Sequence, residues 1–294
     1  MSLGTVGFIG VGRLGLPLAK RLLEAGHAVA TTKRGRSHEL VQAGGHIGGD
    51  GSPQAVAEAS EVIVTCMPSA SAFEDILDGP DGILRANPVP PLIEASTLPL
   101  EVKTTARKKL VAAQSGMLDA PVSGTPAMVE RKIAMIYASG DHDLYLRHEP
   151  VLQAMSPQVT YVGSSLNGSK YKFVAQFLAT INVTAAVEAM AYAQRAGLDL
   201  SEVSKLIAAS PGATSGQFQI RAPLIAAGQF EGTLVTVDMT LKDVDQVLQY
   251  GKEIGAPTDL LAIVAQHYRR LSDAGEGDAE PAKLFTTLTQ GPTP

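Results

Sequence analysis

The stretch Gly7-Phe8-Ile9-Gly10-Val11-Gly12-Arg13-Leu14-Gly15 decides the fold of the first half of the chain. It completes a strand-like run over residues 5–9 and leads into a helical stretch at 16–25, so a G-x-G-x-x-G pattern joins a strand to a helix. In such a turn Gly10 permits the sharp bend, Gly12 lets the backbone approach a pyrophosphate, and Gly15 allows close packing of helix on strand. We therefore predict a dinucleotide-binding turn made by Gly10, Val11, Gly12, Arg13 and Leu14, with a plain glycine-rich turn as the alternative.

Outward from this turn, short β-branched runs alternate with helical stretches up to about residue 163. The predicted strands are 5–9, 27–32, 61–67, 92–95, 117–122, 133–139 and 159–162, and helices fit at 16–25, 54–59 and 101–115. Such alternation is typical of an α/β domain in which helices cover both faces of a mostly parallel sheet. We expect a doubly wound (Rossmann) domain over residues 1–163.

The second half of the chain has a helical pattern throughout. One long helix is predicted over 168–196, with Gly197 as the residue that ends it, and further helices follow at 200–208, 239–254 and 260–274. We expect an all-α domain over residues 164–294, joined to the first by the long interdomain helix. That helix is apolar on nearly all sides, so its neighbours must be protein, and a homodimer or homotetramer is expected. The tail at 291–294 is expected to fray.

Composition restricts the kind of protein this is. Of the 294 residues, 45% are hydrophobic and 18% charged, and the net charge is −5, which disfavours nucleic acid or an acidic membrane surface as partners. The apolar run at 173–191 contains Gln176, Asn182 and Glu188, which favours a buried helix over a membrane span. The single cysteine and the lack of a leader-like N-terminus predict a cytoplasmic protein without an internal disulfide.

A cationic turn follows the second predicted strand. The sequence Thr31-Thr32-Lys33-Arg34-Gly35-Arg36-Ser37 has no acidic residue to accept from a ribose 2′-hydroxyl, as an NAD enzyme would have there. Guanidinium groups bind phosphate through two parallel hydrogen bonds, and a serine hydroxyl adds another. Lys33, Arg34, Arg36 and Ser37 therefore predict a 2′-phosphate site and NADP(H) as cofactor, with NAD(H) and a merely solvated basic turn as the alternatives.

Three further motifs establish a family resemblance. They are Leu118-Asp119-Ala120-Pro121-Val122-Ser123-Gly124, Gly168-Ser169-Lys170-Tyr171-Lys172-Phe173-Val174-Ala175-Gln176 and Leu241-Lys242-Asp243-Val244. Together with the glycine turn, and in this order, they resemble the β-hydroxyacid dehydrogenase family, which includes 3-hydroxyisobutyrate, tartronate-semialdehyde and 6-phosphogluconate dehydrogenases. The resemblance implies hydride transfer between NADP(H) and a small β-hydroxy acid or its semialdehyde, without a metal ion.

The resemblance implies that Lys172 is the general acid and base. As hydride leaves the substrate carbinol carbon, a neutral amine can accept the hydroxyl proton where burial and nearby cations favour its uncharged form. Lys170 and Lys172 point about 200° apart on a helix of ~3.6 residues per turn, so only one of them can face a given site. A solvated helix residue is the alternative interpretation of Lys172.

The same resemblance implies a substrate site. Ser123, Gly124 and Thr125 match the loop that holds the substrate carboxylate, and Gln176 matches a residue that binds the substrate one helical turn after Lys172. Thr125 stands where the family has glycine, and with Pro126 it also has the pattern of a structural helix cap. Ala175 replaces an asparagine common in the family, which removes one polar contact.

The remaining residues that the resemblance assigns bind the cofactor. They are the strand-end pair Met67 and Pro68, the pair Ser96 and Thr97 beside the nicotinamide, and Lys242 from the helical half. Cys66 is interpreted as a small buried side chain. The six histidines lack the spacing of metal ligands, so no metal site is predicted.

Two other functions are compatible with the sequence. An imine reductase has the same overall pattern and favours NADPH, but such enzymes typically have Asp or Tyr in place of Lys172. The other is a non-catalytic NADP-binding protein, for sensing the cofactor or reading histones, which would usually include a further recognition module.

Overall fold

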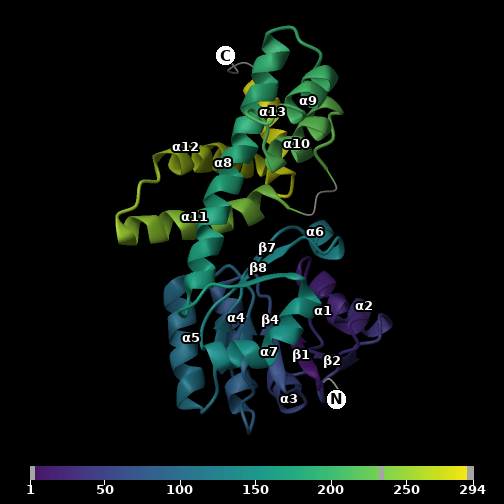
Figure 1. Ribbon diagram of the computed structural model, residues 1–294, viewed down its shortest axis with the longest axis vertical. Coiled ribbons are helices and arrows are strands. Elements are labelled where there is room, and N and C mark those ends of the chain that lie inside the picture. The colour runs from purple at the N-terminus through teal and green to yellow at the C-terminus, as the bar shows by residue number, and fades with distance from the viewer. Residues whose placement is uncertain (1–3, 232–234, 290–294) are drawn as a thin grey trace. The chain divides into compact units, whose positions relative to one another are not determined.

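The glycine turn follows the first strand of a parallel sheet, as predicted. The computed structural model describes residues 4–231 and 235–289, and the fold is shown in Figure 1. In the first sheet the strand order is β3-β2-β1-β4-β5-β6, and every neighbouring pair is parallel. The strands are β1 (Val6–Ile9), β2 (Val29–Thr31), β3 (His46–Ile47), β4 (Val62–Thr65), β5 (Leu92–Glu94) and β6 (Met117–Asp119).

Helices connect these strands and cover both faces of the sheet (Figure 1). They are α1 (Gly15–Glu24), α2 (Ser37–Gln42), α3 (Pro53–Glu58), α4 (Ala70–Asp78) and α5 (Leu100–Ala112). A short 3-10 helix, η1 (Ile83–Arg85), precedes β5. Because alternate residues of a strand point to opposite faces, Val62 and Val64 belong to one apolar cluster while Ile63 belongs to another. The predicted doubly wound sheet is confirmed.

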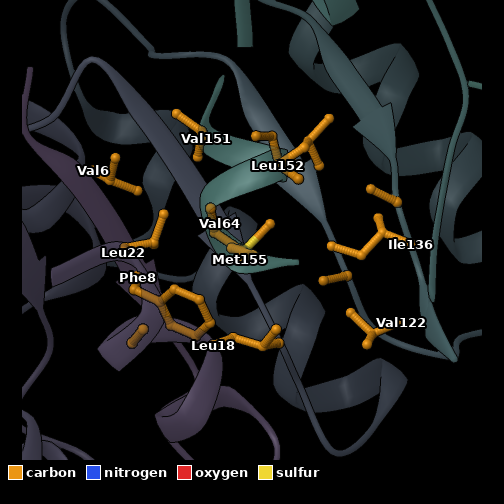
Figure 2. Close-up of a cluster of buried hydrophobic side chains, with 14 of the residues drawn as sticks. Val6, Phe8, Leu18, Leu22, Val64, Val122, Ile136, Val151, Leu152 and Met155 are labelled. Atoms are coloured by element: carbon orange, nitrogen blue, oxygen red, sulfur yellow. The ribbon is translucent and has the colours of Figure 1, made fainter. Parts of the chain in front are cut away.

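Figure 2 shows the first of these clusters, in which Phe8 of β1 and Val64 of β4 lie among side chains of α1 and α7. Leu18 and Leu22 come from α1, and Leu152 comes from α7 (His142–Met155), which packs against α1. The cluster on the opposite face includes side chains of α3, α4 and α5. Each face of the sheet therefore has its own apolar core.

The predicted strand at 117–122 is wrong, because the chain divides it between two sheets. Its first part is β6, and its last residue begins β7 (Val122–Ser123) in a second sheet of order β7-β8-β9. Pro121 lies at the change of sheet, and since proline lacks an N–H group it cannot continue the ladder as a donor. The other members of the second sheet are β8 (Met135–Ala138) and β9 (Gln158–Tyr161), and α6 (Pro126–Glu130) connects β7 to β8.

The rest of the described chain is helical, as predicted. Helix α8 spans Asn167–Arg195, and Gly197 ends it in the left-handed conformation with φ +75°. The helices after it are α9 (Leu200–Ala208), α10 (Gly216–Ala226), α11 (Val237–Ile254), α12 (Asp259–Leu271) and α13 (Leu284–Thr289), with a π turn at Ser272–Glu276 and a 3-10 turn at Pro281–Lys283. Helix α11 starts two residues earlier than predicted, because the Thr236 side chain caps it by accepting from Met239 N. The expected fraying of the tail at 291–294 lies outside the described residues.

Two compact units form, Met1–Lys172 and Phe173–Pro294. The boundary proposed at residue 163 lies just ahead of α8, whose first residues belong to the first unit because Gly168 and Ser169 bond to side chains at the ends of its strands. Helix α8 has the length and apolar content that a membrane span requires, with a mean hydropathy of 1.4 over 18 residues, of which 39% are buried. On its inner face Val187 and Met190 belong to the core of the second unit, whereas Leu178 is exposed in the single chain.

Candidate functional site

The glycine turn at the end of β1 has the geometry that its sequence predicts. Gly10 has φ +104°, and a Cβ there would lie 2.3 Å from the carbonyl oxygen of Cys66. A Cβ on Gly15 would lie 2.0 Å from the carbonyl oxygen of Gly10, so the helix can approach the strand only without a side chain. At Gly12 a Cβ would meet nothing within 4 Å. The backbone at Gly12 is therefore open to an incoming group, which fits a bound pyrophosphate.

The cationic turn between β2 and α2 packs against the glycine turn. Arg36 N donates to the carbonyl oxygen of Val11 at 3.0 Å, and a Cβ on Gly35 would lie 3.1 Å from the same oxygen. Lys33, Arg34 and Arg36 are exposed, while Ser37 is buried as the first residue of α2. The structure thus brings the two predicted cofactor segments together.

Both arginines of the cationic turn have carboxylate partners within the chain. Arg34 NH1 lies 3.1 Å from Asp75 Oδ2, and Arg36 binds both carboxylate oxygens of Glu39, at 2.5 and 2.7 Å. The hydrogen bond between them raises the pKa of the Arg36 guanidinium and lowers that of the Glu39 carboxyl. An anion that binds this turn must compete with Asp75 and Glu39 for the same donors.

The ends of β4 and β5 meet beside the glycine turn. Met67 N donates to Ser96 Oγ at 2.7 Å, and Cys66, the residue before Met67, is the one whose carbonyl lies against Gly10. Ser96 is buried, Thr97 is half-buried and Pro68 is exposed. The predicted cofactor residues of the first unit therefore form one row along the carboxyl ends of β2, β1, β4 and β5, where α/β sheets commonly bind ligands.

The predicted carboxylate loop connects β7 to α6. Ser123 pairs with Met135 across the second sheet, and the side chain of Thr125 accepts from Met128 N at 3.3 Å. Thr125 is thus the N-cap of α6 and Pro126 its first residue, as the sequence predicts. Ser123, Gly124 and Thr125 are all half-buried.

The two lysines at the start of α8 differ in exposure. Lys172 is 6% exposed, whereas Lys170 is exposed. Just before Lys170 in the helix, Gly168 N donates to Ser139 Oγ at 2.9 Å, and Ser169 N donates to Asp119 Oδ2 at 2.7 Å. The start of α8 is therefore attached to the end of β6, the strand next to β5.

A buried ion cluster that the sequence does not predict lies at the ends of β5 and β6. The Lys103 ammonium of α5 lies 2.5 Å from Glu94 Oε2 and 2.7 Å from Asp119 Oδ1, and all three side chains are 0% exposed. Burial raises the pKa of the Glu94 carboxyl. Burial disfavours the charged form of Lys103, but the carboxylates of Asp119 and Glu94 outweigh it and raise the pKa of the amine. One available signal was Glu94, a charged residue within the apolar run Leu92-Ile93-Glu94-Ala95.

Two predicted site residues belong to the second unit. The half-buried Gln176 lies on α8, with its Nε2 3.5 Å from Thr180 Oγ1. Lys242 lies on α11, with its Nζ 3.6 Å from Asp243 Oδ1. Within residues 4–231 and 235–289, no three His, Cys, Asp or Glu side chains are grouped as metal ligands would be.

Comparison with known proteins agrees with this division of the chain. A family model described as the NAD binding domain of 6-phosphogluconate dehydrogenase matches residues 5–163. A second, described as the NAD-binding domain of NADP-dependent 3-hydroxyisobutyrate dehydrogenase, matches residues 167–288.

Individual relatives match over nearly the whole chain. It is 32% identical to L-threonate dehydrogenase from Cupriavidus necator over 95% of each protein. It is 27% identical to 2-(hydroxymethyl)glutarate dehydrogenase from Eubacterium barkeri, over 97% of this chain and 95% of that protein. A crystal structure of 3-hydroxyisobutyrate dehydrogenase from Salmonella typhimurium is similar, with a TM-score of 0.86 at 26% identity, over 97% of this chain and 99% of that one.

Proposed function

Since the chain belongs to the β-hydroxyacid dehydrogenase family, we propose that it oxidises a small β-hydroxy acid reversibly with NADP, using Lys172 as acid and base. One observation carries the mechanistic part of this proposal. Lys172 is 6% exposed near the start of α8, while Lys170 is exposed. The start of α8 is attached to the end of β6, the strand beside the β5 end of the row of predicted cofactor residues. A lysine amine that is largely shielded from water at this place is in position to exchange a proton with a bound substrate.

The residues of the first unit fit a dinucleotide. Open backbone at Gly12 leaves room for a pyrophosphate, and α1 begins just beyond, so its N-terminal N–H groups favour a negative charge there. Lys33, Arg34, Arg36 and Ser37 would hold a 2′-phosphate, which supports NADP(H) over NAD(H). When bound, the nicotinamide supplies a hydride acceptor or donor.

The proton step falls to the protein. As the carbinol carbon becomes a carbonyl, the hydroxyl proton passes to the neutral Nζ of Lys172, and in the reverse direction the ammonium returns it. Ser123 and the backbone N–H groups at Gly124 and Thr125 would hold the substrate carboxylate. The names of the relatives, L-threonate, 3-hydroxyisobutyrate and 2-(hydroxymethyl)glutarate dehydrogenases, support a hydroxy carboxylate as the substrate class.

The test combines a panel of substrates for the wild-type chain with variants of Lys172 and Lys170. The wild-type chain is assayed with L-threonate, 3-hydroxyisobutyrate, their oxidised counterparts and a cyclic imine, each with NADP(H) and NAD(H). On the best hydroxy acid, Lys172→Ala should lower the rate of the chemical step by about 10²–10⁴-fold with little change in cofactor affinity. Lys172→Arg should not restore the rate, because a guanidinium does not release its proton at accessible pH.

Lys170→Ala is the matched control and should have near-normal turnover, since that side chain is exposed. Near-normal turnover by Lys172→Ala, with chemistry shown to limit the rate, would contradict the lysine mechanism. Reduction of the imine in preference to every oxo acid would instead support an imine reductase. Binding of NADP without turnover of any substrate would support a non-catalytic protein.

A further inference from the structure

The buried cluster of Lys103, Glu94 and Asp119 has no assigned part in the proposed reaction. Besides its two carboxylate neighbours, the Lys103 ammonium donates to the carbonyl oxygen of Ser96 at 2.7 Å and to Ser169 Oγ at 3.0 Å. Ser96 N in turn donates to Glu94 Oε1 at 2.9 Å. One ammonium group thus joins the end of β5, the end of β6 and the first turn of α8.

Stability alone does not account for this cluster. Removing three charged groups from water is costly, and well-packed apolar residues of similar volume are often as stabilising as a buried ion pair. A buried ion cluster can instead hold the surrounding backbone in one specific arrangement. Here the arrangement concerns α8.

Asp119 uses both carboxylate oxygens to hold one residue of α8. Its Oδ2 accepts from Ser169 N at 2.7 Å, and its Oδ1 accepts from Ser169 Oγ at 2.8 Å. Ser139 Oγ accepts from Gly168 N at 2.9 Å and lies 3.3 Å from Asp119 Oδ2. These N–H groups belong to the first turn of the helix, where backbone N–H groups have no acceptor within the helix. The helix dipole also favours a carboxylate at this end.

Ser169 precedes Lys172 by three residues, which is one helical turn. The position of Ser169 therefore sets the position and rotation of the backbone that carries Lys172. On its other side the cluster reaches the cofactor row, because Ser96 Oγ accepts from Met67 N at 2.7 Å. The cluster connects the segment proposed to bind nicotinamide with the segment proposed to move the proton.

We propose that Lys103, Glu94 and Asp119 are positioning residues that act through Ser169 to fix Lys172 against the cofactor-binding strand ends. The inference rests on the proposed role of Lys172 in the reaction. Displacing a catalytic group by about 1 Å can cost on the order of 10²-fold in rate, so a loose first turn of α8 should slow chemistry without weakening cofactor binding.

Ser169→Ala is the mildest test, since it removes the hydroxyl that Lys103 and Asp119 share but leaves the contacts of Lys103 with Glu94 and Asp119 in place. It should lower the single-turnover rate by roughly tenfold or more and leave the Kd for NADP unchanged. In a Lys172→Ala background the same change should cause no further loss, because the effect passes through Lys172. The control is Ser156→Ala, which also removes a buried hydroxyl from the first unit, one that bonds to Ala134 rather than to α8.

A second measurement does not depend on activity. Asp119→Asn replaces a carboxylate by a group with one acceptor oxygen, which cannot hold both the N–H and the hydroxyl of Ser169 as Asp119 does. Hydrogen exchange followed by mass spectrometry should then show faster exchange in peptides that cover residues 164–172. Ser156→Ala should leave these peptides unchanged.

The outcomes separate the two proposals. Full turnover by Lys172→Ala would overturn the proposed mechanism and the positioning role with it. If Lys172→Ala loses activity but Ser169→Ala matches Ser156→Ala in rate, the positioning role alone is overturned. Unchanged exchange at 164–172 in Asp119→Asn would likewise show that the cluster does not hold the start of α8.

Discussion

Arg34 and Asp75 face each other across 3.1 Å on the surface, and both side chains are mostly exposed. An exposed ion pair contributes at most about 1 kcal/mol, so a phosphate with two or more charges can displace Asp75 from the guanidinium. The pair then acts as a competitor for the proposed 2′-phosphate, and the strength of NADP binding depends on both residues.

This competition predicts opposite effects of two substitutions. Asp75→Asn should lower the Kd for NADP several-fold and leave that for NAD nearly unchanged, because it releases Arg34 for the phosphate. Arg34→Asp should reverse the cofactor preference, since attraction becomes repulsion and a ribose hydroxyl acquires an acceptor. Titration of each variant with both cofactors measures the two constants.

Asp78→Asn is the matched control, because Asp78 lies on the same helix but pairs with Lys109. It should change neither constant. Equal or tighter binding of NAD by the wild-type chain would contradict the assignment of the cationic turn.

Single residues were predictable from sequence where a motif or a helical period gives the reason. Gly10 has the positive φ that its turn requires. The helical angle predicts that Lys170 and Lys172 differ in burial, and the family resemblance selects Lys172, which is the buried one. Lys103 gave no such signal, because α5 also contains Arg107, Lys108 and Lys109 and has the composition of a solvated face. Which of these cations is buried depends on distant strand ends, which no local pattern reports.

At the scale of elements, α7 contains a buried histidine that should make stability depend on pH. His148 is buried, and its Nε2 has no hydrogen-bond partner within the described residues. Burial, and then the neighbouring charge of Arg147, lower the pKa of His148 below its ordinary value of 6.5. The unfolded chain therefore binds this proton more readily than the folded one.

The free energy of unfolding should fall as the pH drops below about 6.5, by at most about 1.4 kcal/mol per pH unit for one such group. His148→Gln should reduce the slope of stability against pH between 7 and 5, whatever it does to stability at neutral pH. Denaturant unfolding at several pH values measures the slope. His27, whose pKa is also lowered by burial, should supply part of the slope that remains.

His38→Gln provides the comparison, because His38 is exposed on α2 and should leave the slope unchanged. An equal slope in the wild-type chain and in His148→Gln would show that folding does not hinder protonation of His148.

Elements were predictable where periodicity was long and strong. Helix α9 was predicted to the residue, and α8 differs by one residue at each end. The strand predicted at 117–122 failed, because Met117 to Val122 looks uniformly extended while Pro121 marks a change of partner rather than an end. Which strand each residue pairs with decides where one strand ends and the next begins, and the local sequence pattern does not predict that pairing.

At the scale of the whole molecule, the exposed face of α8 predicts self-association. Val174, Leu178 and Tyr192 are 63%, 54% and 78% exposed on the same helix, and large apolar side chains on one face mark an interaction surface. We expect a homodimer or homotetramer, with an interface of about 800 Å² per partner as is usual for stable complexes.

Leu178→Lys should shift the chain toward monomer, since a charge would be buried in the interface without a partner. Sedimentation velocity over a range of concentrations measures the change. Val111→Lys, which alters a similarly exposed residue on α5 of the first unit, should leave the assembly unchanged. A monomeric wild-type chain at micromolar concentration would contradict the prediction.

The two-part organisation was predictable because the hydrophobic period changes after Gly163. The meeting of Glu94, Lys103 and Asp119 was not, since the sheet order that places β5 beside β6 is a property of the whole first unit. Patterns along the chain therefore found the two parts and most of the strands, but α7 and α10 were not among the predicted helices. The contacts among strand ends required the assembled sheet.

The buried cluster also restricts how this protein can evolve. Loss of Lys103 would leave the two carboxylates of Glu94 and Asp119 in the interior without their cation, at a cost of about 3–5 kcal/mol that a marginally stable domain can rarely tolerate. Loss of one carboxylate would still leave Lys103 an acidic partner. Across descendants of this chain Lys103 should therefore be lost only together with both acids, whereas Glu94 or Asp119 can change singly.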